Sequence, residues 1–119
     1  MVDIINIIYH PNFEKELRKI LKKFSGNKTE ILDSLNHNLK ILERFGKKAI
    51  VEPQFELLKG SSKKIHSLRL IKGTPNLRVL FCFLNNNEVI LLAIFYEKGK
   101  NDYRSAIKIA EERFRNYYY

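Results

Sequence analysis

The chain has 119 residues, enough for one domain with a single modest hydrophobic core. Apolar residues make up 45% of it, which excludes a disordered chain, and 22 Lys and Arg against 13 Asp and Glu give a net charge of +9. So strong a bias indicates a polyanionic partner: a nucleic acid, an acidic protein or an anionic membrane surface. Charge alone does not choose among them.

The cysteine content and the hydropathy pattern bear on where the chain works. Its one cysteine, Cys82, excludes an internal disulfide and fits a reducing compartment. The first residues lack the basic start and long apolar run of a secretory signal. No stretch approaches the roughly 20 apolar residues of a membrane span. We therefore expect one cytoplasmic domain, residues 1–119, without membrane contact.

The first part of the chain predicts a strand followed by two helices. Residues 2–9 are rich in isoleucine and end at a His-Pro pair, which is typical of a short strand. Apolar residues then recur at helical spacing over 13–24, with Asn12 as the candidate N-cap. A second amphipathic helix begins near Asn27 and ends at Gly46, which can take the positive φ of a C′ residue. Because their link is short, the helices should form an antiparallel hairpin.

The rest of the chain predicts an irregular segment, three strands and a last helix. Residues 47–64 contain Pro53 and Gly60 and are expected to be irregular. Three apolar runs of strand length follow, at 65–71, 77–84 and 88–96. Three asparagines, residues 85–87, predict a hairpin turn between the last two strands. Asp102 should cap the final helix.

These elements define an expected architecture. Their order is β-α-α-β-β-β-α, which predicts an α+β fold. We expect an antiparallel sheet with the N-terminal helical hairpin packed on it, and a C-terminal helix. The two central strands are apolar on both faces, so that something must cover each face of the sheet.

Several stretches in the second half of the chain carry a family resemblance. They read LERFG at 42–46, FELLKG at 55–60, IHSLRL at 65–70, LRVLF at 77–81 and IFYEKGK at 94–100. In this order and spacing, from about residue 38 onward, they resemble the RelE/ParE toxin superfamily, and within it the phage Gp49-like and HigB-like branch. The first strand and helix agree with this family in pattern only.

The resemblance implies a function. It implies a toxin of a type II toxin–antitoxin system that inhibits translation as a metal-independent, ribosome-associated mRNA endoribonuclease. The implied partners are mRNA, the ribosome and a cognate antitoxin, expected to be a helix-turn-helix protein encoded beside it. Two alternatives remain open: a ParE-like inhibitor of DNA gyrase that cuts nothing, and an inactive phage-derived protein that only binds RNA or a partner.

The residues themselves suggest chemistry without a cofactor. P-loop, G-x-S-x-G and dinucleotide motifs are absent from the sequence, and three scattered histidines with one cysteine do not form a zinc motif. RNA cleavage needs no such group, because the substrate's own 2′-hydroxyl is the nucleophile. The protein must help to remove its proton, stabilise charge on the phosphoryl oxygens and assist the leaving group.

The candidate catalytic residues are Arg69, Arg78, Lys98, Tyr103 and His66. The resemblance places Arg78 at the family's strand arginine, which contacts the scissile phosphate, and Tyr103 at a tyrosine that stacks on or orients the substrate. One aimed donor can contribute about 3–4 kcal/mol. The resemblance implies that a basic residue here, Lys98, adds positive charge in the transition state, and a neutral His66 could act as the base.

Each candidate also has a structural interpretation. Arg78 could be solvated or paired with Glu88 across the hairpin, Tyr103 could simply pack in the helix's apolar stripe, and a lone histidine on a strand is more often structural. Four lysines are expected to grip the RNA backbone rather than to do chemistry: Lys59, Lys63, Lys64 and Lys100. The functional hypothesis requires Arg69, Arg78, Lys98 and Tyr103 to converge on one concave surface of the sheet.

Overall fold

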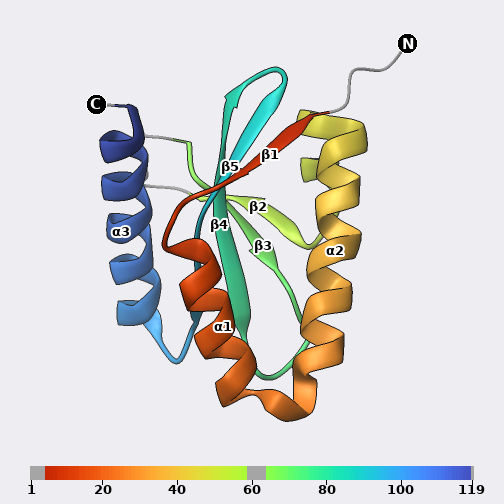
Figure 1. The fold of residues 1–119 in the computed structure, drawn as a ribbon, viewed down its shortest axis with the longest axis vertical. Coiled ribbons are helices and arrows are strands. Elements are labelled where there is room, and N and C mark those ends of the chain that lie inside the picture. Colours follow the sequence, from red (N-terminus) through yellow and green to blue (C-terminus); the bar gives the residue numbers. More distant parts are fainter. Residues whose placement is uncertain (1–4, 59–63, 119) are drawn as a thin grey trace.

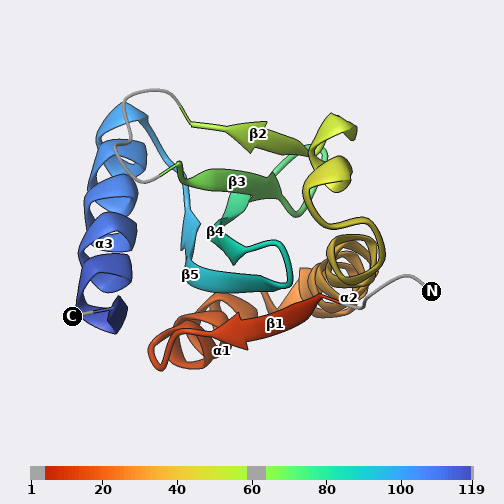
Figure 2. The ribbon, with the colours of Figure 1, turned by 90° about the horizontal axis from the view of Figure 1, so that it is seen from above.

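A five-stranded sheet forms the centre of the molecule, with helices on both faces (Figures 1 and 2). The computed structural model describes residues 5–58 and 64–118. The helices are α1 (Phe13–Lys23), α2 (Lys28–Phe45) and α3 (Lys100–Tyr118), with short 3₁₀ helices η1 (Ser25–Asn27) and η2 (Gly46–Val51). The strands are β1 (Asn6–Tyr9), β2 (Phe55–Leu57), β3 (His66–Arg69), β4 (Leu77–Asn85) and β5 (Glu88–Tyr96).

The sheet confirms the α+β fold class but differs from the expected one in two ways. Its strand order is β1-β5-β4-β3-β2, and β1 pairs with β5 in parallel whereas all other pairs are antiparallel. The sheet is therefore mixed, not wholly antiparallel. A parallel pair needs a long crossover, which the chain from α1 to β4 supplies. The hydrophobic pattern within one strand does not indicate whether that strand pairs in parallel or antiparallel with its neighbour.

The second difference is the short edge strand β2, which lies in the segment expected to be irregular. Phe55 is buried, whereas Glu56 and Leu57 are exposed. Three residues are too few to show a strand period, and Pro53 lies two residues before the first of them. β2 completes the sheet beside β3 and brings Glu56 opposite Ser67.

The first face of the sheet packs against α1 and α2. The predicted apolar stripes of both helices are buried there against alternate residues of β4 and β5. The main contributors are Phe13, Ile20, Ile31, Leu35, Leu39, Leu42, Val79, Phe81 and Leu91. Each large side chain buried in this way contributes roughly 1.5–3 kcal/mol. The helical hairpin thus lies on one face, as expected.

The opposite face packs against α3. Ala106 and Ala110 are buried against Leu80, Ile90 and Leu92. These alanines have short side chains, so that α3 lies close against the sheet. The first turn of α3 lies beside the beginning of β4, because Tyr103 packs there against Arg78. In the described part of the chain, no helix has the length and apolar character needed to cross a membrane.

Two helix ends show how local sequence sets the path of the chain. Gly46 follows α2 with φ +57°, the positive φ expected of it, and a methyl group there would collide with the side chain of Ile5. Asp102 is not the N-cap of α3, because that helix already begins at Lys100. Its carboxylate instead reaches back and accepts the backbone N–H groups of Lys98 and Gly99, at 2.8 and 3.1 Å.

Candidate functional site

Arg78 lies at the beginning of β4 and faces α3. Its neighbours Leu77 and Val79 are fully buried in the core under α1 and α2, so that strand alternation turns Arg78 to the other face. Across the sheet it pairs with Arg69 of β3 and Phe95 of β5. Its side chain is 18% exposed, enough to be reached from solvent.

Two carboxylates hold the Arg78 guanidinium. Nε of Arg78 donates to Oε2 of Glu97 at 3.1 Å, and that same oxygen accepts Nδ2 of Asn76 at 2.6 Å. Glu56 lies farther away, with 3.8 Å between Arg78 Nη1 and Glu56 Oε2, and its side chain is 62% exposed. The Glu97 contact therefore fixes the guanidinium, whereas so exposed an ion pair with Glu56 contributes at most about 1 kcal/mol.

Glu88 is not the partner of Arg78. It lies at the other end of the β4–β5 hairpin, where Asn85 Nδ2 donates to its carboxylate at 2.7 Å. The interpretation that paired Arg78 with Glu88 is therefore wrong. Antiparallel register places residues near the turn far from the beginning of β4.

Tyr103, in the first turns of α3, packs against Arg78. The Arg78 Cζ lies 5.5 Å from the centre of the Tyr103 ring, and this ring meets Phe95 edge to face at 6.0 Å. The Tyr103 side chain also hydrogen-bonds to Ser67. Burial, and next the negative charge of Glu56, raise the pKa of the Tyr103 phenol above its ordinary value of 10.0. Its hydroxyl is therefore protonated at neutral pH.

These residues line an open groove between β2 and α3, with a volume of about 540 Å³. The described residues that line it are Glu56, Leu57, Leu58, Arg78, Glu97, Lys100, Tyr103 and Arg104. Three of these side chains are cations and two are carboxylates. The volume lies in the range of small-ligand sites, and the floor carries a fixed guanidinium beside an aromatic ring. We call this the Arg78 groove.

Arg69 leaves the sheet on the same face as Arg78 but is not among the described residues that line the groove, whereas Lys100, predicted to grip RNA, is one of them. Arg69 is the cross-strand partner of Arg78, so that both side chains leave the same face of the sheet. No ion pair of Arg69 is present within residues 5–58 and 64–118. Lys100 lines the groove itself, from the first residue of α3.

Lys98 does not join them. Its Nζ lies 5.7 Å from the centre of the Tyr96 ring, which packs against Phe24 next to the end of α1. This ring belongs to the core on the face opposite Arg78. The expectation that Lys98 converges with Arg78 is therefore wrong, because the chain turns between β5 and α3.

His66 also lies on the opposite face. Its ring stacks on Phe81 at 5.4 Å, meets the edge of Phe83 at 5.3 Å, and is 7% exposed. Its Nδ1 lies 3.1 Å from the carbonyl oxygen of Lys64. Burial lowers the pKa of His66, which favours the neutral imidazole. The prediction that His66 is the catalytic base at this site is wrong, because Ser67, the next residue, faces Arg78 instead.

The predicted RNA-gripping lysines have mixed outcomes. Lys64 is exposed two residues before β3 begins and is not among the residues that line the groove. Lys59 and Lys63 lie outside the described residues. The described residues also contain no group of three or more His, Cys, Asp or Glu that could hold a metal ion.

Sequence reasoning missed four residues of the site: Glu56, Ser67, Glu97 and Arg104. Glu56 lies in the three-residue strand, and its neighbour Leu57 is just as exposed, so that no alternation marked it. Ser67 acquires its position through pairing across strands, and Glu97 through the hydrogen bond that its backbone N–H donates to the carbonyl oxygen of Asn76 just beyond the paired residues of β4 and β5. Arg104 follows Tyr103 on α3. It lies four residues after Lys100 and therefore on the same face of the helix, and this spacing was the one sequence feature that could have identified it as a site residue.

The architecture defines the fold class of the protein. A twisted sheet with a helical hairpin on one face and a C-terminal helix on the other form a RelE-like fold. Three solved structures share it at 21% identity, each aligned over 78% of this chain and 97% of the other. They are the YoeB dimer from Staphylococcus aureus (TM-score 0.56), the YoeB–YefM complex from the same organism (0.54) and the heterotetrameric YoeB–YefM toxin–antitoxin complex (0.55).

The sequence gives the family directly. Residues 19–115 match the model of the phage-derived Gp49-like protein family (DUF891). The chain belongs to this family, and the resemblance to the Gp49-like branch is thereby confirmed. No curated protein sequence matches the chain.

Proposed function

We propose that this protein is the toxin of a type II toxin–antitoxin pair, and that it is a cytoplasmic endoribonuclease that cuts mRNA on the ribosome at the Arg78 groove. The observation that carries the proposal is the fixed Arg78 guanidinium, which faces an open groove together with Tyr103 and Glu56. Membership of the Gp49-like family and a fold shared with the YoeB of a toxin–antitoxin complex support it.

Glu56 is the group best placed to act as the base. In the described part of the groove, Glu56 and Glu97 are its two carboxylates, and Glu97 is held by Arg78 and Asn76. Glu56 is more exposed and only weakly paired, so that an entering phosphate can take its place beside Arg78. The freed carboxylate then accepts the proton of the 2′-hydroxyl.

The remaining groups stabilise the charge that develops. The 2′-oxygen attacks phosphorus and the bond to the 5′-oxygen breaks, which gives a 2′,3′-cyclic phosphate and a 5′-hydroxyl end. Arg78 binds the phosphoryl oxygens, and Lys100 and Arg104 add positive charge at the groove wall. Tyr103, protonated at neutral pH, donates a proton to the leaving 5′-oxygen. This route requires no metal ion or cofactor.

The antitoxin is the second expected partner. The net charge of +9 favours an acidic protein that neutralises the RNA-binding surfaces, and we expect a helix-turn-helix protein encoded beside the toxin. Co-purification of the two gene products tests this pairing.

Primer extension on cellular mRNA after brief expression tests the function. The wild type should produce discrete new 5′ ends, and Arg78→Ala should abolish them while its circular dichroism spectrum is unchanged. Growth arrest with intact mRNA and new DNA breaks would instead assign the protein to gyrase inhibition. Absence of both toxicity and cleavage would identify an inactive relative.

A further inference from the structure

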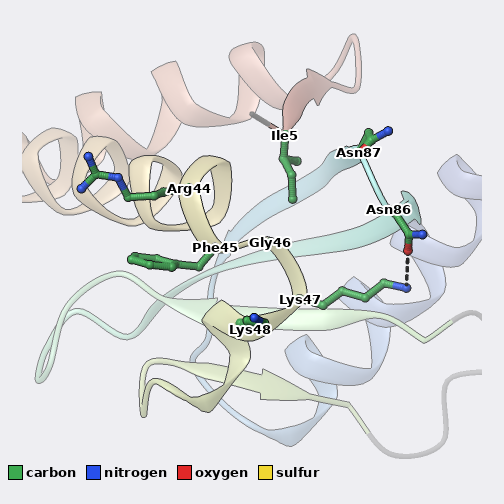
Figure 3. A pocket seen from close by; sticks show the side chains of 8 residues that line it. All are labelled: Ile5, Arg44, Phe45, Gly46, Lys47, Lys48, Asn86 and Asn87. Carbon is green, nitrogen blue, oxygen red and sulfur yellow. Dashed lines mark hydrogen bonds between the residues drawn. The ribbon is translucent and has the colours of Figure 1, made fainter. Parts of the chain in front are cut away.

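A second hollow lies at the other end of the β4–β5 hairpin (Figure 3). Its volume is about 790 Å³, and three separate segments line it: the residue before β1, the end of α2 with the start of η2, and the β4–β5 turn. The lining residues are Ile5, Arg44, Phe45, Gly46, Lys47, Lys48, Asn86 and Asn87. We call it the Phe45 pocket.

Among the described residues, the charged side chains that line this pocket are all positive. Arg44, Lys47 and Lys48 are exposed, and the described lining residues include no carboxylate. Lys47 Nζ donates to Asn86 Oδ1 at 3.5 Å, as Figure 3 shows. In the part of the chain that the structure describes, none of the three cations forms an ion pair. The Phe45 pocket is thus open to an anion, whereas carboxylates already occupy Arg78 in its groove.

An exposed aromatic ring accompanies these cations. Phe45 is 54% exposed although it is a large apolar side chain. Gly46, with its positive φ, turns the chain directly after α2, and residues on both sides of it line the hollow: the Phe45 and Arg44 side chains are directed to one side, and Lys47 is directed toward Asn86 (Figure 3). A solvent-facing aromatic ring next to unpaired cations is the combination that binds single-stranded nucleic acid, because bases stack on the ring and phosphates meet the cations.

We propose that the Phe45 pocket binds single-stranded RNA at a distance from the cleavage site. Phosphates contact Arg44, Lys47 and Lys48, and a base stacks on Phe45. The Asn86 and Asn87 amides offer donors and acceptors to sugar hydroxyls or base edges. The choice of RNA among polyanions rests on the proposed function.

The two sites are too far apart to bind one phosphodiester. Arg78 lies near the start of β4, and Asn86 is the first residue after its end, eight residues further along the chain, which is roughly 26 Å at about 3.3 Å per residue. Contacts in the Phe45 pocket therefore raise the affinity of the protein for RNA, and the pocket takes no part in the cleavage chemistry. Loss of this pocket should weaken binding and leave the rate of the chemical step unchanged.

Fluorescence anisotropy tests this proposal. The probe is a labelled 12-nucleotide 2′-O-methyl uridine RNA, which the enzyme cannot cut because the nucleophile is blocked. The variant R44Q/K47Q/K48Q is compared with R18Q/K19Q/K22Q, which removes the same charges from exposed positions of α1. A plot of log affinity against log salt concentration has a negative slope. In the pocket variant this slope should become less steep by about two, at about 0.7 for each lost phosphate contact. The α1 variant should keep the wild-type slope.

A second pair of variants isolates the stacking. Phe45→Leu should weaken RNA binding by about tenfold, the effect of one lost base stack, whereas Phe45→Tyr should keep wild-type affinity. Circular dichroism establishes that each variant is folded. Equal slopes for the two triple variants, or equal affinities for the two Phe45 variants, would overturn the proposal.

Two further measurements distinguish RNA binding in this pocket from binding of an acidic protein partner and from the proposed nuclease function. If R44Q/K47Q/K48Q loses binding of a labelled acidic peptide, Glu-Glu-Leu-Glu-Glu-Leu, but keeps the RNA slope, the pocket belongs to a protein partner and the proposal fails. Cleavage of unmodified RNA is scored independently. A wild type that cuts nothing, with RNA affinity still dependent on the pocket, would remove the proposed nuclease function and leave this inference standing.

Discussion

Arg78 and Glu97 form a shielded ion pair, with 3.1 Å between Nε and Oε2 and with each side chain 18% exposed. Asn76 donates to the same carboxylate oxygen and so fixes Glu97 in turn. The guanidinium is thus oriented before any substrate arrives, and such preorganisation is the main source of electrostatic stabilisation in active sites.

Removing Glu97 should therefore cost stability. Glu97→Ala leaves the Arg78 guanidinium without its short partner and should lower the free energy of unfolding by about 1–3 kcal/mol. Urea denaturation followed by circular dichroism measures this change. Glu112→Ala, at an exposed position of α3, is the control and should change it by less than about 0.5 kcal/mol. Equal effects of the two substitutions would show that the ion pair is not structural.

Glu56 should affect the rate of cleavage rather than binding. Glu56→Gln removes the proposed base and should lower the single-turnover cleavage rate by about 10²–10⁴-fold. RNA should bind equally well or more tightly, because one negative charge leaves the groove. Glu52→Gln, exposed and just before β2, is the matched control. Cleavage by Glu56→Gln at the wild-type rate would exclude Glu56 as the base.

The Tyr103 hydroxyl should contribute to both stability and cleavage. Tyr103→Phe keeps the ring against Arg78 and removes the hydrogen bond to Ser67, which should cost about 1 kcal/mol. It should also slow cleavage, because the proton donor for the leaving oxygen is gone. Urea denaturation and single-turnover rates measure the two effects, and unchanged values for both would contradict the assigned role.

The raised pKa of Tyr103 predicts a pH dependence of stability. The folded state holds the phenolic proton more tightly than the unfolded chain, where the pKa is about 10. This contribution is therefore complete below pH 10 and is lost as the pH rises through the folded pKa. The stability difference between the wild type and Tyr103→Phe should stay constant from pH 7 to 9 and shrink above pH 10. A difference that grows with pH would contradict the direction of the shift.

The ion pair between Arg113 of α3 and Glu16 of α1 should join these two helices to each other and to β5. Arg113 donates to both Glu16 oxygens, at 2.7 and 2.8 Å, and to the carbonyl oxygen of Leu92 at 2.8 Å. Arg113→Ala should destabilise the protein by about 2–4 kcal/mol, and Arg113→Lys should restore little, because lysine cannot form the two-point contact. Arg115→Ala, an exposed position, is the control in urea denaturation. Full rescue by lysine would contradict the bidentate geometry.

The sequence predicts most of this fold because its elements are long and amphipathic. The stripes of α1 and α2, the β4–β5 hairpin and the apolar face of α3 all follow from local periodicity. The parallel pairing of β1 and the existence of β2 do not, because neither leaves a periodic signal in so few residues.

The site was less predictable, since it depends on which face each side chain takes. Arg78 was identified through its buried neighbours and the family resemblance. His66 and Lys98 were wrongly placed because one step along a strand, or one turn after it, reverses the direction of a side chain. Glu56 and Glu97 were missed as site residues because their role arises from pairing across strands.

The most direct test is the single-turnover cleavage rate of ribosome-bound mRNA by purified Arg78→Ala, with Arg18→Ala as the exposed-arginine control. The proposed mechanism predicts a loss of about 10²–10³-fold for Arg78→Ala and the wild-type rate for Arg18→Ala. Wild-type cleavage by a folded Arg78→Ala protein would contradict it.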